Sequence, residues 1–268
     1  MPRVRAIMGC FPPRDLDFRL PLVHHSLTAY LLGGAAALLM GLAKTGLPGV
    51  SIPAVLLMVE AFSDDAKASV GAIMPAILLG DVFAVVWFHR HADWARLGGL
   101  VPYVAAGMAL GAFVLARTTG NELRPILGWL VAAFLIVEVC RQQFRWETMP
   151  GQWWFVATMG LVAGFGTMVG NAAGPVMTIY LISRGLRKQE FIGTCAWFFF
   201  IVNLSKLPIM CGLGMLTTDT VGFGLIVAGL APVGAILGVW LLRIIPQRPF
   251  DVLALALAGL AAVRLIVA

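Results

Sequence analysis

Long apolar runs separated by short polar connections make up most of this chain. Ten apolar segments can be delimited, at 27–43, 49–62, 68–88, 97–116, 124–140, 152–168, 175–184, 189–212, 220–242 and 250–268. The longer ones approach the roughly 20 residues that a helix needs to cross a hydrocarbon core of about 30 Å. They are apolar at nearly every position, whereas the strands of a membrane β-barrel alternate between apolar and polar residues. Because an open chain in lipid can satisfy its backbone only by forming helices, the pattern predicts an all-α integral membrane protein.

Two apolar regions contain residues that interrupt helices. LAKTGLPGVSIPAV, residues 42–55, combines glycines and prolines with a charged lysine, and GTMVGNAAGP, residues 166–175, lies inside an uncharged run from 151 to 183. That run is too long for one span of about 20 residues and too short for two spans with a loop. We therefore predict broken helices, with breaks at 44–49 and 169–175 inside the membrane.

Matched features in the two halves of the chain indicate a duplication. GMALG at 107–111 resembles GAILG at 234–238, Arg124-Pro125 resembles Arg248-Pro249, and Asp93 matches Asp219, all at separations of 124 to 127 residues. Five segments in each copy would give the two copies opposite orientations in the membrane. This predicts two inverted five-segment repeats, an architecture of secondary transporters whose sites lie at broken helices near the midplane.

The predicted organisation has four parts. A tail covers residues 1–26, the first repeat 27–141, a linker loop 142–151 and the second repeat 152–268.

Charge and motif content exclude several functional classes. Only 12% of residues are charged, and the net charge of +6 comes from basic residues spread over the short connections. Such charges set topology and contact lipid headgroups, so membrane lipid is an expected partner and nucleic acid is not. No metal-ligand spacing, cofactor motif or hydrolase motif occurs. An enzyme is therefore not expected, and a membrane-embedded enzyme stays as the less favoured alternative.

The two breaks supply most of the candidate substrate-binding residues. A helix N-terminus attracts anions through its unpaired N–H groups, and burying a lysine at membrane depth costs about 2.5 to 3.5 kcal/mol, so an anionic substrate would explain the lysine. The candidates are Lys44, Thr45, Gly46, Gly49, Ser51, Gly170, Asn171 and Gly174. The alternatives are that Lys44 extends to the membrane interface and that the small residues serve close helix packing.

Three polar residues of the inner segments complete the set. Asp81 and Lys206 are 125 residues apart, at equivalent positions of the predicted repeats, and Asn203 precedes Lys206 by nearly one helical turn. We expect Asp81 and Lys206 to meet, with Lys206 and Asn203 binding the anion. Asp81 is then either a structural ion-pair partner or a proton carrier, and Asn203 alternatively only bridges two helices.

The chain resembles the TauE/SafE sulfite exporter family, also called TSUP, over about residues 27–268. The resemblance rests on LAKTGLPGVSIPAV, on GFGTMVGNAAGPVMTIYL and on the connection HRHADWARLGGLVP. It implies transport, most often export, of sulfite or organosulfonates such as sulfoacetate and taurine-related compounds across the bacterial cytoplasmic membrane, driven by an ion or proton gradient. Asn171, Ala172 and Ala173 depart from the glycines common in the family at that break. A carrier or channel for another small anion, such as a carboxylate, stays open.

Orientation follows from the basic loops. Excluding the tail, the connections on the side opposite the termini carry more arginines and lysines, which favours that side as cytoplasmic. We therefore expect periplasmic termini, although the arginines of the tail favour the opposite orientation. Whether the protein forms a homodimer stays open.

Overall fold

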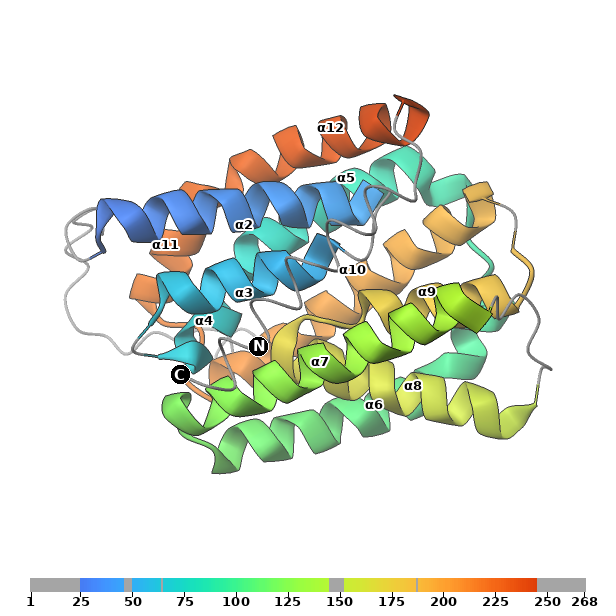
Figure 1. Cartoon of the computed structure of the whole chain (residues 1–268), viewed down its shortest axis with the longest axis horizontal. Coiled ribbons are helices and arrows are strands. Elements are labelled where there is room, and N and C mark those ends of the chain that lie inside the picture. Colours follow the sequence, from blue (N-terminus) through green and yellow to red (C-terminus); the bar gives the residue numbers. More distant parts are fainter. Residues whose placement is uncertain (1–24, 46–49, 64, 145–151, 187, 245–268) are drawn as a thin grey trace, which may run out of the picture.

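The computed structural model describes residues 25–45, 50–63, 65–144, 152–186 and 188–244. Within these ranges the regular structure consists of helices, without strands. The helices are α2 (Leu27–Thr45), α3 (Ser51–Ala61), α4 (Ala66–Ala72), α5 (Met74–Phe88), the short η2 (His89–His91), α6 (Trp94–Arg117), α7 (Gly120–Phe144), α8 (Trp153–Gly170), α9 (Gly174–Ser183), α10 (Lys188–Gly212), α11 (Thr218–Ala228) and α12 (Leu230–Ile244). Figure 1 shows them running roughly parallel or antiparallel in one bundle.

The apolar segments expected from the sequence are present as helices wherever the structure describes them. Nine of the ten correspond to α2 through α12 within a few residues, and the tenth, 250–268, lies outside the described residues. Five helices are long and apolar enough to cross a membrane, or up to six if α11 and α12 form one bent span. The chain is therefore a multi-pass membrane protein.

Polar residues at the helix N-termini explain where several helices begin. Asp65 Oδ1 accepts hydrogen bonds from Lys67 N at 2.9 Å and Ala68 N at 3.1 Å, and Asp93 Oδ1 accepts one from Arg96 N at 3.1 Å. Such side-chain caps satisfy N–H groups that the first helical turn leaves unpaired. They place these helix starts in the polar connections.

Two helix breaks that the sequence interpretation missed divide segments expected to be continuous. α4 gives way to α5 at Ile73, two residues before Pro75 in the first turn of α5, although the two helices together still form one apolar span, Ala66–Phe88. α11 and α12 meet at Gly229 with a bend of 42°, and Pro232 follows in the first turn of α12. A proline lacks the N–H of the helical hydrogen bond and its ring clashes with the carbonyl four residues earlier, which accounts for both breaks.

Close helix crossings hold the two halves of the chain together. α6 packs along α8, and α12 packs along α2, in the two most extensive helix contacts. A Cβ atom added at Gly41 would lie 1.9 Å from the carbonyl oxygen of Ala231, and one added at Gly164 would lie 2.2 Å from that of Val104. Small residues at a membrane crossing let two backbones approach this closely.

The bundle has two distinct ends, each tied together by polar contacts. At one end Lys67 Nζ donates to Thr118 O at 3.1 Å, and His25 Nε2 lies 3.2 Å from Asp219 Oδ2. At the other end Asp93 N donates to Thr194 Oγ1 at 3.0 Å. The long helices run between these ends (Figure 1).

Candidate functional site

The second predicted break is confirmed between α8 and α9. α8 ends at Gly170, and Asn171 adopts a left-handed conformation with φ 54° and ψ 25°. Asn171 N donates to Thr167 O and Ala172 N donates to Gly166 O, both at 3.1 Å. Asparagine is one of the few residues besides glycine that tolerate this conformation at a helix C-terminus, so the sequence ends α8 here.

The first predicted break separates α2 from α3. α2 ends at Thr45 and α3 begins at Ser51. The residues at 46–49, which include Gly46 and Gly49, lie outside the described residues.

A small cavity lies between residues that flank the two breaks. Its polar wall consists of Lys44, Ser51, Thr167, Asn171 and Asn203, contributed by α2, α3, α8, the α8–α9 connection and α10. Its volume of about 20 Å³ is room for about one water molecule. The first residues of α3 and α9 both reach this cavity, since Ser51 and Gly174 line it.

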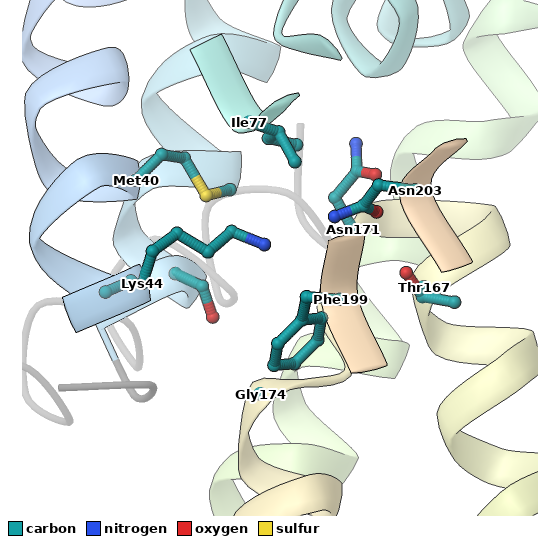
Figure 2. Close-up of a pocket in the computed structure, with 10 residues that line it drawn as sticks. Met40, Lys44, Ile77, Thr167, Asn171, Gly174, Phe199 and Asn203 are labelled. Atoms are coloured by element: carbon teal, nitrogen blue, oxygen red, sulfur yellow. The ribbon is translucent and has the colours of Figure 1, made fainter. Parts of the chain in front are cut away.

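Apolar side chains form the rest of the wall. Met40, Ile77 and Phe199 line the cavity, and the Lys44 ammonium lies 4.3 Å from the centre of the Phe199 ring. Figure 2 shows Lys44 extending across the cavity toward the wall that holds Asn171 and Asn203, with Phe199 below it. An ammonium over an aromatic face is attracted by the ring quadrupole, which helps to hold Lys44 in this position.

Lys44 forms a buried ion pair with Asp81 of α5. The Lys44 Nζ–Asp81 Oδ1 distance is 2.7 Å, and the side chains are 10% and 0% exposed. Asn203 Nδ2 donates to Asp81 Oδ2 at 2.6 Å. One carboxylate oxygen therefore lies against an ammonium and the other accepts a hydrogen bond.

Lys206 is buried in α10, about one helical turn after Asn203 of the same helix. Its Nζ donates to Thr167 O at 3.0 Å, to Thr167 Oγ1 at 3.1 Å and to Asn171 Oδ1 at 2.6 Å. These three acceptors match the three protons of an ammonium group. Lys206 thus holds in place two residues of the cavity wall without lining the cavity itself.

The expected pairing of Asp81 with Lys206 is wrong. Asp81 pairs with Lys44, and the hydrogen bonds of Lys206 go to uncharged oxygens of α8 and its cap. Although α10 packs along α5, Lys206 points toward α8 while Asp81 faces α2. The alternative in which Lys44 extends to the interface also does not fit, because its ammonium contacts a fully buried carboxylate.

The other predicted site residues divide into two groups. Lys44, Ser51, Asn171, Gly174 and Asn203 line the cavity. Thr45 and Gly170 do not line the cavity and contact neighbouring helices. Thr45 Oγ1 donates to Ala235 O of α12 at 2.8 Å, and a Cβ at Gly170 would lie 2.7 Å from the Leu127 side chain of α7.

The sequence interpretation missed several wall residues. Thr167 could have been predicted from the sequence. It lies in GTMVGNAAGP, residues 166–175, and follows Lys44 by 123 residues, a separation close to that of the matched features. Met40, Ile77 and Phe199 could not, since an apolar residue in an apolar helix does not reveal which way it faces.

The buried charges do not balance. Asp81 is the one acidic side chain among the buried residues that the structure describes, whereas Lys44 and Lys206 supply two positive charges next to the cavity. The described part of the chain has no group of three His, Cys, Asp or Glu side chains that could hold a metal ion. The arrangement therefore suits binding of an anion by an excess of one positive charge.

Comparison with known proteins adds a family. The model of the family described as Sulfite exporter TauE/SafE matches residues 29–265, nearly the whole chain. Neither the curated proteins nor the solved structures include a match. The apolar bundle agrees with a transport family of multi-pass membrane proteins. The chain belongs to the TauE/SafE sulfite exporter family.

Proposed function

We propose that the protein is a secondary transporter that exports sulfite or a small organosulfonate anion across the bacterial cytoplasmic membrane by alternating access. The observation that carries the proposal is the excess of one positive charge at a cavity between two broken helices. A charge buried at membrane depth is costly and is typical of a substrate or ion pathway. An anion in the cavity would neutralise it.

Two helix N-termini strengthen the anion interpretation. α3 starts at Ser51 and α9 starts at Gly174, and both residues line the cavity. The N-terminal end of a helix carries about half a positive charge and N–H groups without helical acceptors. Discontinuous helices that point such ends at an anionic group are a feature of transporter sites.

Reciprocal packing supports two inverted repeats. A Cβ at Gly107 of α6 would lie 2.1 Å from Leu161 O of α8, and a Cβ at Gly234 of α12 would lie 1.9 Å from Leu38 O of α2. The two glycines are 127 residues apart and their two partners 123. Each half of the chain therefore uses the same kind of crossing against the other half, as a pseudo-twofold axis would require.

The size of the cavity supports a conformational change. A volume of about 20 Å³ leaves room for about one water molecule, which is too little for a sulfonate. Substrate binding therefore requires a state in which the walls move apart, and movement of one repeat against the other around a fixed site would provide it.

The test is substrate binding by lysine variants of the purified protein. Lys44→Gln should weaken binding of sulfite or sulfoacetate by about 1.5 to 3 kcal/mol, the range for a hydrogen bond to a charged group, because Lys44 lines the cavity. Lys206→Gln should also weaken binding, because it removes a positive charge beside the cavity and the hydrogen bonds that hold Thr167 and Asn171. Lys67→Gln is the matched control, because Lys67 donates to Thr118 O at one end of the bundle, away from the cavity. Wild-type affinity in correctly folded Lys44→Gln and Lys206→Gln would remove both lysines from the site.

A second measurement separates the substrate and mechanism alternatives. Lysines and asparagines also bind carboxylates, so thermal shifts with sulfite, sulfoacetate, taurine and acetate should be compared. Counterflow in proteoliposomes then distinguishes a carrier, which exchanges labelled for unlabelled substrate, from a channel. Stabilisation by acetate alone would assign the site to carboxylates.

A further inference from the structure

The charges around the cavity bear on how many negative charges a bound anion should carry. We propose that the site selects monoanions over dianions and that Asp81 sets this preference, an inference that rests on the proposed anion site. Lys44 and Lys206 contribute two positive charges and Asp81 one negative charge. A monoanion brings the buried total to zero, whereas a dianion leaves an uncompensated negative charge.

The hydrogen bonds support this charge count. Asp81 Oδ1 lies 2.7 Å from Lys44 Nζ in an ion pair, and Asp81 Oδ2 accepts a hydrogen bond from Asn203 Nδ2 at 2.6 Å. Lys206 meets three acceptors. A carboxylate only accepts and an ammonium only donates, so both groups sit in surroundings built for their charged forms.

Asp81 acts on the substrate through its charge and not through contact. It does not line the cavity, whereas its partners Lys44 and Asn203 do. Replacing Asp81 by asparagine therefore changes the charge count by one while every wall side chain remains. The amide oxygen of the Asp81→Asn variant would still accept a hydrogen bond from Asn203. Asp81 is thus a specificity-determining residue that does not touch the substrate.

The apolar part of the wall narrows the class of monoanion. Met40, Ile77 and Phe199 face the same cavity as the charged groups. A sulfonate carries one negative charge at one end and an organic group at the other, which matches a wall that is charged on one side and apolar on another. Sulfite fits the same rule as the bisulfite monoanion.

The experiment compares two anions whose charge does not change with pH near neutrality. Methanesulfonate carries one negative charge and sulfate two, and calorimetric titration of the full chain in detergent gives a Kd for each at equal ionic strength. The wild type should bind methanesulfonate about tenfold or more tighter than sulfate, because one unbalanced charge at a few ångströms in a protein interior is worth at least that factor. Asp81→Asn should move this ratio toward sulfate by about tenfold or more.

Thr167 provides a second test that does not disturb the ion pair. Its hydroxyl lies 3.1 Å from Lys206 Nζ, so Thr167→Asp places a carboxylate beside an existing ammonium and removes the positive excess. This variant should lose binding of both anions, while the uncharged Thr167→Asn should keep the preference for methanesulfonate over sulfate.

The outcomes separate this inference from the anion site itself. Equal binding of methanesulfonate and sulfate by the wild type, or a ratio unchanged in Asp81→Asn, overturns the valence rule and leaves the anion site standing. Methanesulfonate binding retained by Thr167→Asp overturns the rule even if Asp81→Asn does not fold. Binding of neither anion by the wild type overturns the proposed site together with the rule.

Discussion

At the scale of single residues, the most unusual feature is an ion pair in the interior of a membrane bundle. Lys44 and Asp81 lie 2.7 Å apart, and the Asp81 side chain is fully buried. Removing two charges from water costs several kcal/mol each, and their attraction offsets this only when the geometry is good and the remaining hydrogen bonds are satisfied. Asn203 provides one of these bonds. The pair is therefore weak evidence for stability and stronger evidence for a role at the cavity.

The ion pair leads to a prediction about stability. Lys44→Met or Asp81→Asn alone should destabilise the protein by about 3 to 5 kcal/mol, because each leaves one buried charge without its partner. The double variant should recover most of this loss, since Met retains the packing of the lysine stem and Asn retains an acceptor for Asn203. Thermal unfolding in detergent measures the three variants.

Substrate binding by the same double variant tests the function of the pair. The measurement is made on the purified double variant. It should be folded and yet bind substrate weakly, because Lys44 lines the cavity. A double variant as unstable as the two single variants together would show that the charges are not coupled.

At the scale of helices, glycines determine how closely the elements pack. Gly41 and Gly164 lie against backbone carbonyls of α12 and α6, which cannot rotate away as a side chain can. The same helices α2 and α8 end at the two breaks beside the cavity. The crossings therefore position Lys44 and Thr167, which lie within one turn of the ends of α2 and α8.

Substitution of these glycines should separate packing from helix propensity. Gly41→Ala and Gly164→Ala should each cost about 1 to 3 kcal/mol through overpacking, seen as a lower unfolding temperature in detergent. Gly98→Ala and Gly99→Ala in α6 are matched controls, because a Cβ at either position meets nothing within 4 Å. The controls should be neutral or stabilising by up to about 1 kcal/mol, since alanine favours helix over glycine. Equal melting of all four variants would contradict the packing role.

At the scale of the whole molecule, the bundle presents two ends that carry different numbers of basic side chains. Lys67, Arg117 and Arg124 belong to the end where α4 and α7 begin. The end where α6 begins, which Asp93 and Thr194 tie together, has six basic residues at its helix ends: Arg90, Arg96, Arg141, Arg184, Lys188 and Arg243. Cytoplasmic connections carry the excess of arginine and lysine, so the end at which α6 begins should face the cytoplasm.

Cysteine labelling tests this orientation. Asn121 and Ala95 are exposed residues in the first turns of α7 and α6, at opposite ends of the bundle. In a background whose native cysteines are replaced by serine, an impermeant maleimide should label Asn121→Cys in cells with a permeabilised outer membrane. It should label Ala95→Cys only after the inner membrane is broken. The reverse pattern would invert the topology, and labelling of both in intact inner membranes would contradict the predicted arrangement.

The sequence by itself determined the membrane class, the positions of the helices and the breaks at α2–α3 and α8–α9. These features depend on local quantities, because a run of apolar residues predicts a span and a cluster of glycine, proline or asparagine ends a helix. Lys44, Asn171 and Asn203, which line the cavity, were recognisable from the sequence as candidate site residues. Polar residues in apolar segments need a partner or a function.

Only the tertiary structure decided which charges meet and which prolines end a helix. Asp81 pairs with Lys44 and not with Lys206, because the rotation and offset of packed helices determine the direction of each side chain, and neither is written in local spacing. Pro75 and Pro232 follow breaks, whereas Pro102 and Pro208 lie within continuous helices. The sequence looks similar at all four prolines, and the packing of neighbouring helices decides whether the freed backbone groups are accommodated or the chain bends.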